Sequence, residues 1–252
     1  MMNNPMKICV IENGRTPDDL IGEYGSYPEM IKRWIESALP EATFTFVSPV
    51  TGDKLPKPHE YDGYILSGSK FSTYERAPWM LALIAFLQQL RTEKIPVFGI
   101  CFGHQIMADA YGGLTEKNLR GWGVGAQLYE YKTDKLPAQS SSFIFHQDQV
   151  TKIPPEAKVI GGSIHCPNGV FEYEFPACSV QYHPEFSAAY ITALAKKFRG
   201  NLLPDSVSAC ALSSVERLQV DASVIAEWVA NFFRSRVKRV NRYASLGEPY
   251  AS

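Results

Sequence analysis

The chain has 252 residues, of which 45% are apolar and 20% charged, a composition ordinary for a globular protein with a sizeable core. It excludes a mostly disordered chain, which would combine low hydrophobicity with high net charge. The 25 basic and 26 acidic residues leave a formal charge of −1, so the basic excess usual in nucleic-acid-binding proteins is missing. The longest apolar stretch, residues 80–87, is far shorter than the roughly 20 residues that a membrane span requires. We therefore expect neither a nucleic acid nor a membrane as a partner.

The first half of the chain alternates strand and helix patterns. Apolar, β-branched and aromatic runs predict strands, whereas apolar residues at helical spacing, such as Met30, Ile31 and Trp34, predict helices. This alternation predicts an α/β fold with a mostly parallel central sheet flanked by helices. The predicted strands cover residues 7–11, 43–47, 63–66 and 96–100, and the predicted helices cover residues 28–39, 78–90 and 103–111.

The second half contains short strand patterns separated by turns, which indicates antiparallel additions beside the parallel sheet. Helices are predicted again over residues 188–198 and 221–240, with a connection and a short helix over residues 200–220. We expect one domain over residues 1–200 and a C-terminal helical extension and tail over residues 201–252. The predicted short strands cover residues 124–131, 143–145, 158–161, 170–175 and 179–182.

The cysteine content indicates a reducing environment. The five cysteines are widely spaced and form no Cys-x-x-Cys pair, so neither a disulfide framework nor a structural zinc site is expected. Residues 1–6 lack the apolar segment of a signal peptide. A cytoplasmic location therefore fits best.

The most informative motif lies where the strand at residues 96–100 meets the next helix. Gly99-Ile100-Cys101-Phe102-Gly103 has the Gly-x-nucleophile-x-Gly form of a nucleophile elbow, with cysteine as the nucleophile. The neighbours of such a tight turn must be small, and the thiol would lie at a helix N-terminus, where the helix dipole favours the thiolate. Taken alone, the motif fits a buried cysteine in a glycine-containing turn equally well.

A nucleophilic cysteine needs a base, and the sequence offers His183. His183 and Glu185 stand two residues apart at the end of a predicted strand, so their side chains would project to the same side. Glu185 can then hold the imidazole in the tautomer that presents a free nitrogen to the thiol. Three other histidines lie in loops or point poorly for a base; they are His59, His104 and His165.

Together these motifs resemble those of the class I, or triad, glutamine amidotransferases. The resemblance rests on residues 99–105 (GICFGHQ) and 181–185 (QYHPE), in this order and with cysteine and histidine 82 positions apart. It covers roughly residues 7–198 and is nearest to stand-alone glutaminase domains similar to the amidotransferase part of GMP synthase. It implies a flavodoxin-like fold, Cys101 as nucleophile, His183 as base and acid, and Glu185 as the residue that orients His183. It implies no metal and no organic cofactor.

The resemblance also implies an oxyanion hole and a substrate site. The turn after residues 63–66 would supply the amide of Ser69, and the second amide would be that of Phe102. Such donors are worth about 3–4 kcal/mol each by analogy with measured cases. The segment at residues 145–150 resembles one that meets the substrate's α-carboxylate and amine, largely through its backbone. The implied substrate-binding residues are Gly68, Gln105, His146, Gln147 and Asp148.

The chain departs from the family pattern at the oxyanion turn. Ser69-Lys70 stands where the family usually has Gly-Pro. A serine amide can donate, but a positive φ would strain it, which would restrict the oxyanion hole to an activated state. The segment at residues 13–27 is longer than a strand–helix link needs, so it either covers the site, shapes an acceptor pocket or is a variable surface loop.

The C-terminal part carries a cluster of basic residues after an apolar helix face. We interpret this cluster as a solvated helix end whose charge complements the helix dipole, rather than as a nucleic-acid site. The 54 residues that follow residue 198 are too few for a synthetase domain. The basic residues are Arg234, Arg236, Lys238, Arg239 and Arg242.

The predicted activity is cleavage of a γ-glutamyl amide, glutamine or another, through a γ-glutamyl thioester. Three interpretations stay open. The protein is a glutaminase that passes ammonia to a separate synthetase subunit, or a stand-alone γ-glutamyl peptidase, or a non-catalytic regulatory or binding subunit with the same fold. The altered oxyanion turn is the only support for the third interpretation, and the intact Cys-His-Glu set weighs against it.

Overall fold

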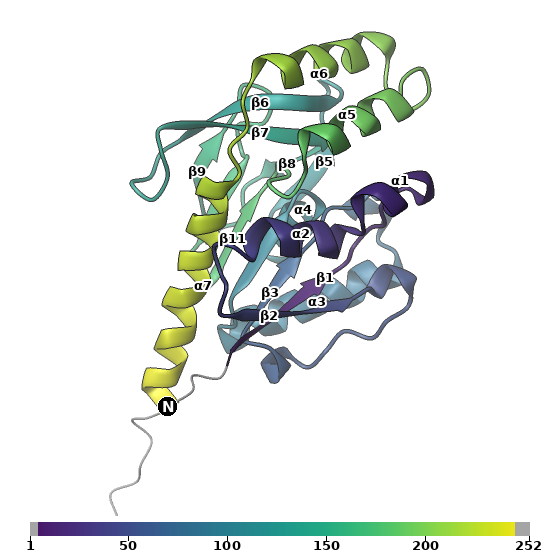
Figure 1. The fold of residues 1–252 in the computed structure, drawn as a ribbon. Helices are drawn as coiled ribbons and strands as arrows, with labels where there is room; N and C mark the ends of the chain where they lie inside the picture. The colour runs from purple at the N-terminus through teal and green to yellow at the C-terminus, as the bar shows by residue number, and fades with distance from the viewer. Residues whose placement is uncertain (1–4, 245–252) are drawn as a thin grey trace, which may run out of the picture.

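A nine-stranded mixed sheet forms the centre of the molecule (Figure 1). The computed structural model describes residues 5–244. The strands are β1 (Met6–Ile11), β2 (Ala42–Val47), β3 (Gly63–Leu66), β4 (Val97–Ile100), β5 (Leu114–Lys117), β6 (Gly123–Tyr131), β7 (Gln139–His146), β8 (Asp148–Lys152), β9 (Ala157–Gly162), β10 (Val170–Tyr173) and β11 (Ala177–Val180). The helices are α1 (Asp18–Tyr24), α2 (Tyr27–Ile35), α3 (Pro78–Glu93), α4 (Phe102–Ala110), α5 (Ala188–Lys197), α6 (Asp205–Arg217) and α7 (Ser223–Ala244).

One half of the sheet is parallel. In the strand order β2-β1-β3-β4-β11-β10-β9-β6-β7, the first five strands pair in parallel. Every residue of β3, β4 and β11 is buried, as expected for a parallel sheet covered on both faces. The predicted fold class is therefore confirmed. In such sheets ligands bind at the carboxyl ends of the strands, which is where β4 leads into Cys101 and β11 into residues 181–185.

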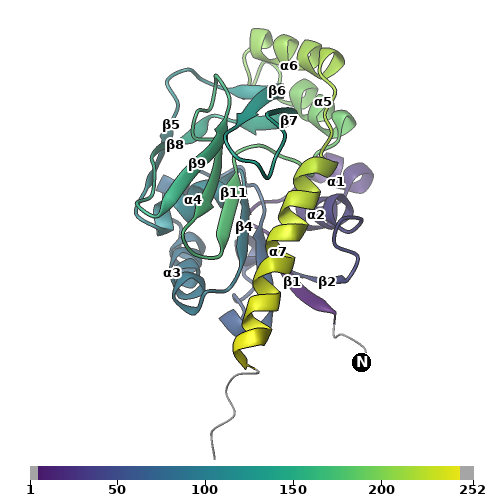
Figure 2. The ribbon, with the colours of Figure 1, turned by 90° about the vertical axis from the view of Figure 1, so that its left-hand side faces the viewer.

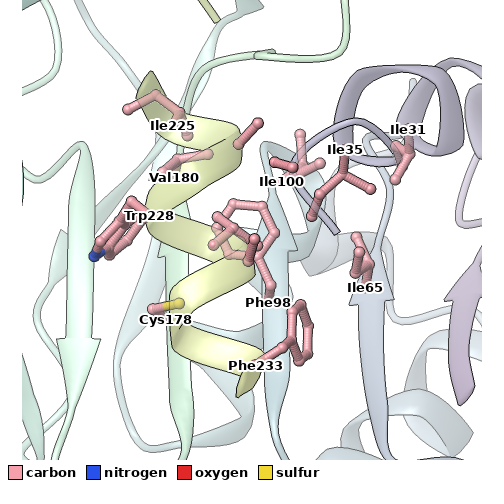
Figure 3. Close-up of a cluster of buried hydrophobic side chains, with 14 of the residues drawn as sticks. Ile31, Ile35, Ile65, Phe98, Ile100, Cys178, Val180, Ile225, Trp228 and Phe233 are labelled. Atoms are coloured by element: carbon pink, nitrogen blue, oxygen red, sulfur yellow. The ribbon is translucent and has the colours of Figure 1, made fainter. Parts of the chain in front are cut away.

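Helices cover both faces of the parallel half. On one face α2 and α7 contribute to a common apolar cluster, in which Trp228 and Phe233 of α7 join Phe98 of β4 (Figure 3). On the other face α3 and α4 pack through side chains such as Leu83 and Met107. Figure 2 shows α7 and α3 on opposite sides of β4.

The other half of the sheet is antiparallel. β10, β9, β6 and β7 extend it beyond β11, which confirms the predicted antiparallel additions. Here α5 and α6 pack against β6, and the amide of Ala126 donates to Ser214 Oγ of α6 at 2.9 Å. A Cβ on Gly125 would lie 2.8 Å from the Cα of Ala211, so only glycine lets this helix rest directly on the strand. β5 and β8 form a separate two-stranded sheet.

Four elements differ from the sequence predictions. One is β8, since no strand was predicted over residues 148–152, where Val150 is the only apolar residue. Residues 13–27 contain α1, a seven-residue helix without a fully buried side chain, whose apolar residues Leu20 and Tyr24 are only partly buried. Residues 200–220 contain the 13-residue α6 instead of a short helix. β5 is polar with one buried residue, and this pattern gives no strand signal.

The basic residues of α7 also differ in part from the prediction. The Arg234 side chain is paired with protein groups and does not simply extend into solvent. Its Nε lies 2.6 Å from Glu41 Oε1, and its Nη2 donates to the Ala38 carbonyl at 2.6 Å. Arg234 therefore connects α7 to the segment between α2 and β2. The side chains of Lys238, Arg239 and Arg242 lie outside those described. Within residues 5–244, no helix combines the length and apolar character needed to cross a bilayer.

Candidate active site

The turn between β4 and α4 holds Cys101 in an unusual backbone conformation. Its φ is 52° and its ψ is −101°, a region that non-glycine residues rarely occupy and that costs on the order of 1–3 kcal/mol. Two hydrogen bonds hold it there: its amide donates to the Val180 carbonyl at 2.8 Å, and its carbonyl accepts from the Gln105 amide at 3.0 Å. The strained geometry is that of a nucleophile elbow.

The two glycines of the motif allow the close packing that this turn requires. A Cβ on Gly99 would lie 2.7 Å from the backbone of Gly103 and 2.5 Å from Met107 Sδ. A Cβ on Gly103 would lie 2.7 Å from the carbonyl oxygen of Leu66 in β3. Larger residues at either position would push α4 away from the strands.

The segment after β11 brings His183 and Glu185 together. The His183 amide donates to the Phe143 carbonyl at 2.8 Å, and His183 Nδ1 lies 2.8 Å from Glu185 Oε1. The two side chains are only 5% and 0% exposed. The ring of Phe186 stacks on the imidazole at 3.9 Å and 7°. With Nδ1 bound to Glu185, Nε2 is the nitrogen left for another partner.

His183 and Cys101 converge at Gly68. A Cβ on Gly68 would lie 2.7 Å from His183 Cε1 and 3.7 Å from Cys101 Cβ. Burial lowers the pKa of His183, but interactions with Glu185 and Cys101 outweigh it and raise this pKa to about 10. The cause is the pair of acidic groups on either side of the ring, which favour the imidazolium.

The turn after β3 carries Ser69, whose amide is expected to form one part of the oxyanion hole, and the second expected amide is that of Phe102 at the start of α4. Asn13 anchors this turn, since its amide donates to Ser67 Oγ at 2.9 Å and its Nδ2 to the Ser67 carbonyl at 3.0 Å. Among the described residues, positive φ occurs at three non-glycine positions, and Ser69 is not one of them. The positive φ that would strain Ser69 is therefore absent. No acceptor within residues 5–244 pairs with the amides of Ser69 or Phe102.

The residues expected to contact substrate gather beside the thiol. Gln105, His146, Gln147 and Asp148 line one cavity together with Cys101 and His183. Burial lowers the pKa of His146 to about 3, so the ring is neutral. Its Nδ1 donates to the Asp148 carbonyl at 3.1 Å, and its Nε2 has no partner among the described residues. That nitrogen is a free hydrogen-bond acceptor.

The cavity is larger than the space around the thiol. Its volume is about 760 Å³, within the range of pockets that hold drug-sized ligands. Trp122, Phe145 and Phe198 form an aromatic wall, with ring centroids 5.4 and 5.8 Å apart in succession. Three exposed cationic side chains also line the cavity; they are Arg15, Lys70 and Lys117.

Three of the other cysteines and the ring of His104 are buried away from the thiol of Cys101. Burial raises the pKa of Cys9 to about 12 and raises those of Cys166 and Cys178 as well. Burial lowers the pKa of His104 to about 3; this ring donates from Nε2 to the Asn168 carbonyl and accepts from Ser179 Oγ. His59 is exposed and pairs with Glu93 at 2.7 Å.

Several residues of the candidate site were not among those predicted from the sequence. Gln181 lies 3.5 Å from Cys101 Sγ, and its two-residue spacing from His183 was a signal that it shares the same side. Asn13 and Phe186 carried no such signal. From the segment at residues 13–27, Arg15, Thr16, Pro17, Asp18 and Tyr27 line the cavity.

Comparison with known proteins places this chain in a family. The sequence model of "Glutamine amidotransferase class-I" matches residues 20–198, so the chain belongs to the class I glutamine amidotransferases. It is 31% identical to a glutamine-hydrolyzing GMP synthase subunit of Methanothrix thermoacetophila over 71% of this chain and 89% of that one. It is 27% identical to gamma-glutamyl peptidase 3 of Arabidopsis thaliana over 69% and 75%.

Solved structures agree on the fold. The crystal structure of a glutamine amidotransferase from Thermotoga maritima superposes with a TM-score of 0.73 at 20% identity. The match covers 94% of this chain and all of that one. Because so little of the chain lies outside the match, most of residues 201–244 are included in the structural likeness.

Proposed function

We propose that this protein hydrolyses γ-glutamyl amides, with Cys101 as nucleophile, His183 as acid and base, and Glu185 as the residue that orients His183. The observation that carries the proposal is the convergence of a strained Cys101 and a Glu185-bound His183 beside Gly68. A buried carboxylate on Nδ1 fixes the tautomer and leaves Nε2 for the thiol. A free-thiol nucleophile also suits the reducing cytoplasm expected from the cysteine pattern.

The chemistry runs in two halves. The Cys101 thiolate attacks the carbon of the side-chain amide, and the negative charge that forms on the oxygen faces the amides of Ser69 and Phe102. His183, which holds the proton of the thiol, gives it to the nitrogen as the carbon–nitrogen bond breaks. A γ-glutamyl thioester remains. His183 then deprotonates a water that attacks the thioester carbon, and glutamate and the thiol are released.

The α-amino acid end of the substrate would lie against residues 146–148. His146 Nε2 is a buried acceptor without a partner among the described residues, and an α-ammonium group supplies the donor it lacks. The Asp148 carboxylate already accepts from Ser72 Oγ at 2.5 Å and Tyr74 at 3.2 Å. Its position is therefore fixed before substrate arrives.

Two leaving groups remain in competition. Ammonia released for a separate synthetase subunit is supported by the likeness to the GMP synthase chain of Methanothrix thermoacetophila. A larger amine, as in a γ-glutamyl peptide, is supported by the cavity and its aromatic wall. The cavity volume of about 760 Å³ exceeds what glutamine alone fills. The strained elbow supports either activity over a non-catalytic role, because such strain persists where function requires it.

The deciding experiment compares ammonia release from glutamine with amine release from γ-glutamyl dipeptides, using the purified chain alone. We expect hydrolysis by the wild type and by Cys210→Ala, a control at an exposed cysteine outside the cavity, and none by Cys101→Ala. Turnover that survives in Cys101→Ala would disprove the mechanism. If the folded wild type hydrolyses neither substrate class, the non-catalytic interpretation takes its place.

A further inference from the structure

Two buried amide side chains form a hydrogen-bonded chain that ends on the thiol of Cys101. Gln105 Nε2 donates to the backbone carbonyl of Asp148 at 2.9 Å and to Gln181 Oε1 at 3.2 Å. Gln181 Nε2 lies 3.5 Å from Cys101 Sγ, where it donates a hydrogen bond to the sulfur. Gln181 is fully buried and Gln105 is 3% exposed, so water does not compete for these contacts.

The direction of every bond in this chain follows from one main-chain oxygen. A carbonyl oxygen only accepts, so the group of Gln105 that faces Asp148 must be its NH₂. The second hydrogen of that NH₂ points to Gln181 Oε1. The amide of Gln181 is thereby oriented with its own NH₂ toward Cys101, which settles an assignment that is ambiguous for an isolated glutamine.

The sheet brings Gln181 to the thiol. β4 and β11 pair in parallel with Val180 opposite Ile100, so the next residues along the two strands, Gln181 and Cys101, emerge side by side. Gln181 and His183 stand two residues apart and project to the same side. The thiol therefore meets a hydrogen-bond donor from Gln181 as well as the imidazole of His183.

We propose that Gln181 stabilises the Cys101 thiolate by donating a hydrogen bond to Sγ, and that Gln105 holds Gln181 in the required orientation. A thiolate accepts more strongly than a thiol, because hydrogen bonds to charged acceptors are the stronger ones. Gln181 touches the reacting sulfur and is a catalytic residue in this sense, whereas Gln105 acts through it and is a positioning residue. The role in hydrolysis rests on the proposed function, but the effect on the thiol does not.

The test is the rate at which iodoacetamide alkylates Cys101, measured against pH. The Cys101 peptide is read by mass spectrometry, because Cys210 is exposed and also reacts. Gln181→Met keeps the length of the side chain without its donor, and we expect the midpoint of the profile to rise by about one to two pH units. Gln181→Glu keeps an acceptor for Gln105 but places a negatively charged carboxylate next to the sulfur, which disfavours the thiolate. The midpoint of its alkylation profile should therefore rise at least as much.

Two further variants separate this role from general loosening of the turn. Gln105→Met should raise the midpoint of the alkylation profile by a smaller amount, because Gln181 can still donate to Cys101 Sγ but is no longer oriented by Gln105. Gln88→Met is the matched control: Gln88 Nε2 donates to the Ala110 carbonyl at the other end of α4, at 3.3 Å, and its loss should leave the profile unchanged.

The outcomes are distinct. An unchanged alkylation profile in the folded Gln181 variants overturns the proposal, and so does an equal rise in Gln88→Met. If only one Gln181 variant folds, the alkylation profile of that variant decides whether the proposal stands. If neither folds, an unchanged midpoint in Gln105→Met overturns the proposal. Failure of the proposed function looks different: the wild type would hydrolyse no γ-glutamyl amide while the Gln181 variants still shift the profile.

Discussion

At the scale of single residues, the site depends on groups that have no room to move. Gly68, in the turn after β3, lies against both His183 and Cys101, and a single added methyl group would meet the imidazole at 2.7 Å. That imidazole is held by Glu185 on one side and by the stacked Phe186 on another. The ring can relieve the contact only by leaving its position beside the thiol.

Gly68→Ala should therefore reduce kcat/KM for γ-glutamyl amides by on the order of 100-fold, the effect expected of a displacement of about 1 Å. The fold should survive, because the change adds one methyl group in a turn. Gly22→Ala is the control, since a Cβ at Gly22 in α1 would meet nothing within 4 Å. Full activity in Gly68→Ala would show that His183 does not need its present position.

Glu185→Gln should weaken catalysis much less than His183→Ala. An amide oxygen can still accept from Nδ1, but it no longer stabilises the imidazolium by charge. One lost charge-assisted hydrogen bond of about 1.5–3 kcal/mol corresponds to roughly a 10–150-fold decrease in rate. His183→Ala removes both the base and the acid, so its loss should be larger by further powers of ten. Both effects are measured as the acylation rate of each variant with a γ-glutamyl substrate that has a poor leaving group. Equal decreases in rate in the two folded variants would contradict the orienting role of Glu185.

The sequence predicted the members of the site better than their arrangement. Cys101, His183 and Glu185 follow from two local motifs, because the elbow and the His-x-Glu spacing are properties of a few consecutive residues. Asn13 and Gln105 could not be placed in the same way, since their partners at Ser67 and Gln181 lie 54 and 76 positions away. Whether Ser69 is strained could not be predicted from its residue type, because φ at that position depends on how Asn13 and Gly14 pack against the turn.

At the scale of elements, apolar patterning predicted what packs into the core. The strands β1, β3, β4 and β11 were readable because they are buried. α1 was not, because it has only seven residues and none of them is fully buried, although Leu20 and Tyr24 pack against the core from partly exposed positions. We propose that residues 201–252 are an extension of the family domain and not a second core, since α7 shares one apolar cluster with β4 and β11.

Phe233 of α7 offers a direct measure of that packing. Its side chain is fully buried, and its ring lies so close to β3 that a Cβ on Gly63 would meet it at 2.6 Å. Phe233→Ala should lower the free energy of unfolding by about 3–5 kcal/mol, measured by urea denaturation. The neighbouring Phe232 is only partly buried, so Phe232→Ala should have a clearly smaller effect. Equal effects would mean that α7 is not docked on the sheet as described.

At the scale of the whole molecule, three buried histidines link the stability of the fold to pH. Burial lowers the pKa of His104 and His146 to about 3, whereas the unfolded value is about 6.5. The unfolded chain therefore binds more protons between these pH values, and stability falls as the pH falls below about 6.5. His183 acts in the opposite sense: its folded pKa of about 10 means that its contribution is complete below about 6.5 and is lost as the pH rises toward 10.

The combined contribution of these three histidines to the free energy of unfolding should thus be greatest near pH 6.5. Between pH 6 and 4.5 each neutral histidine contributes a slope of up to about 1.4 kcal/mol per pH unit. His104→Gln keeps groups that can bond to Ser179 and Asn168 but cannot titrate, so urea unfolding across this range should show a slope smaller by about that amount. His183→Gln should leave the acid slope unchanged and flatten the alkaline side. An acid slope in His104→Gln identical to that of the wild type would mean that His104 is not buried as a neutral ring, and the packing of α4 against β11 would have to be revised.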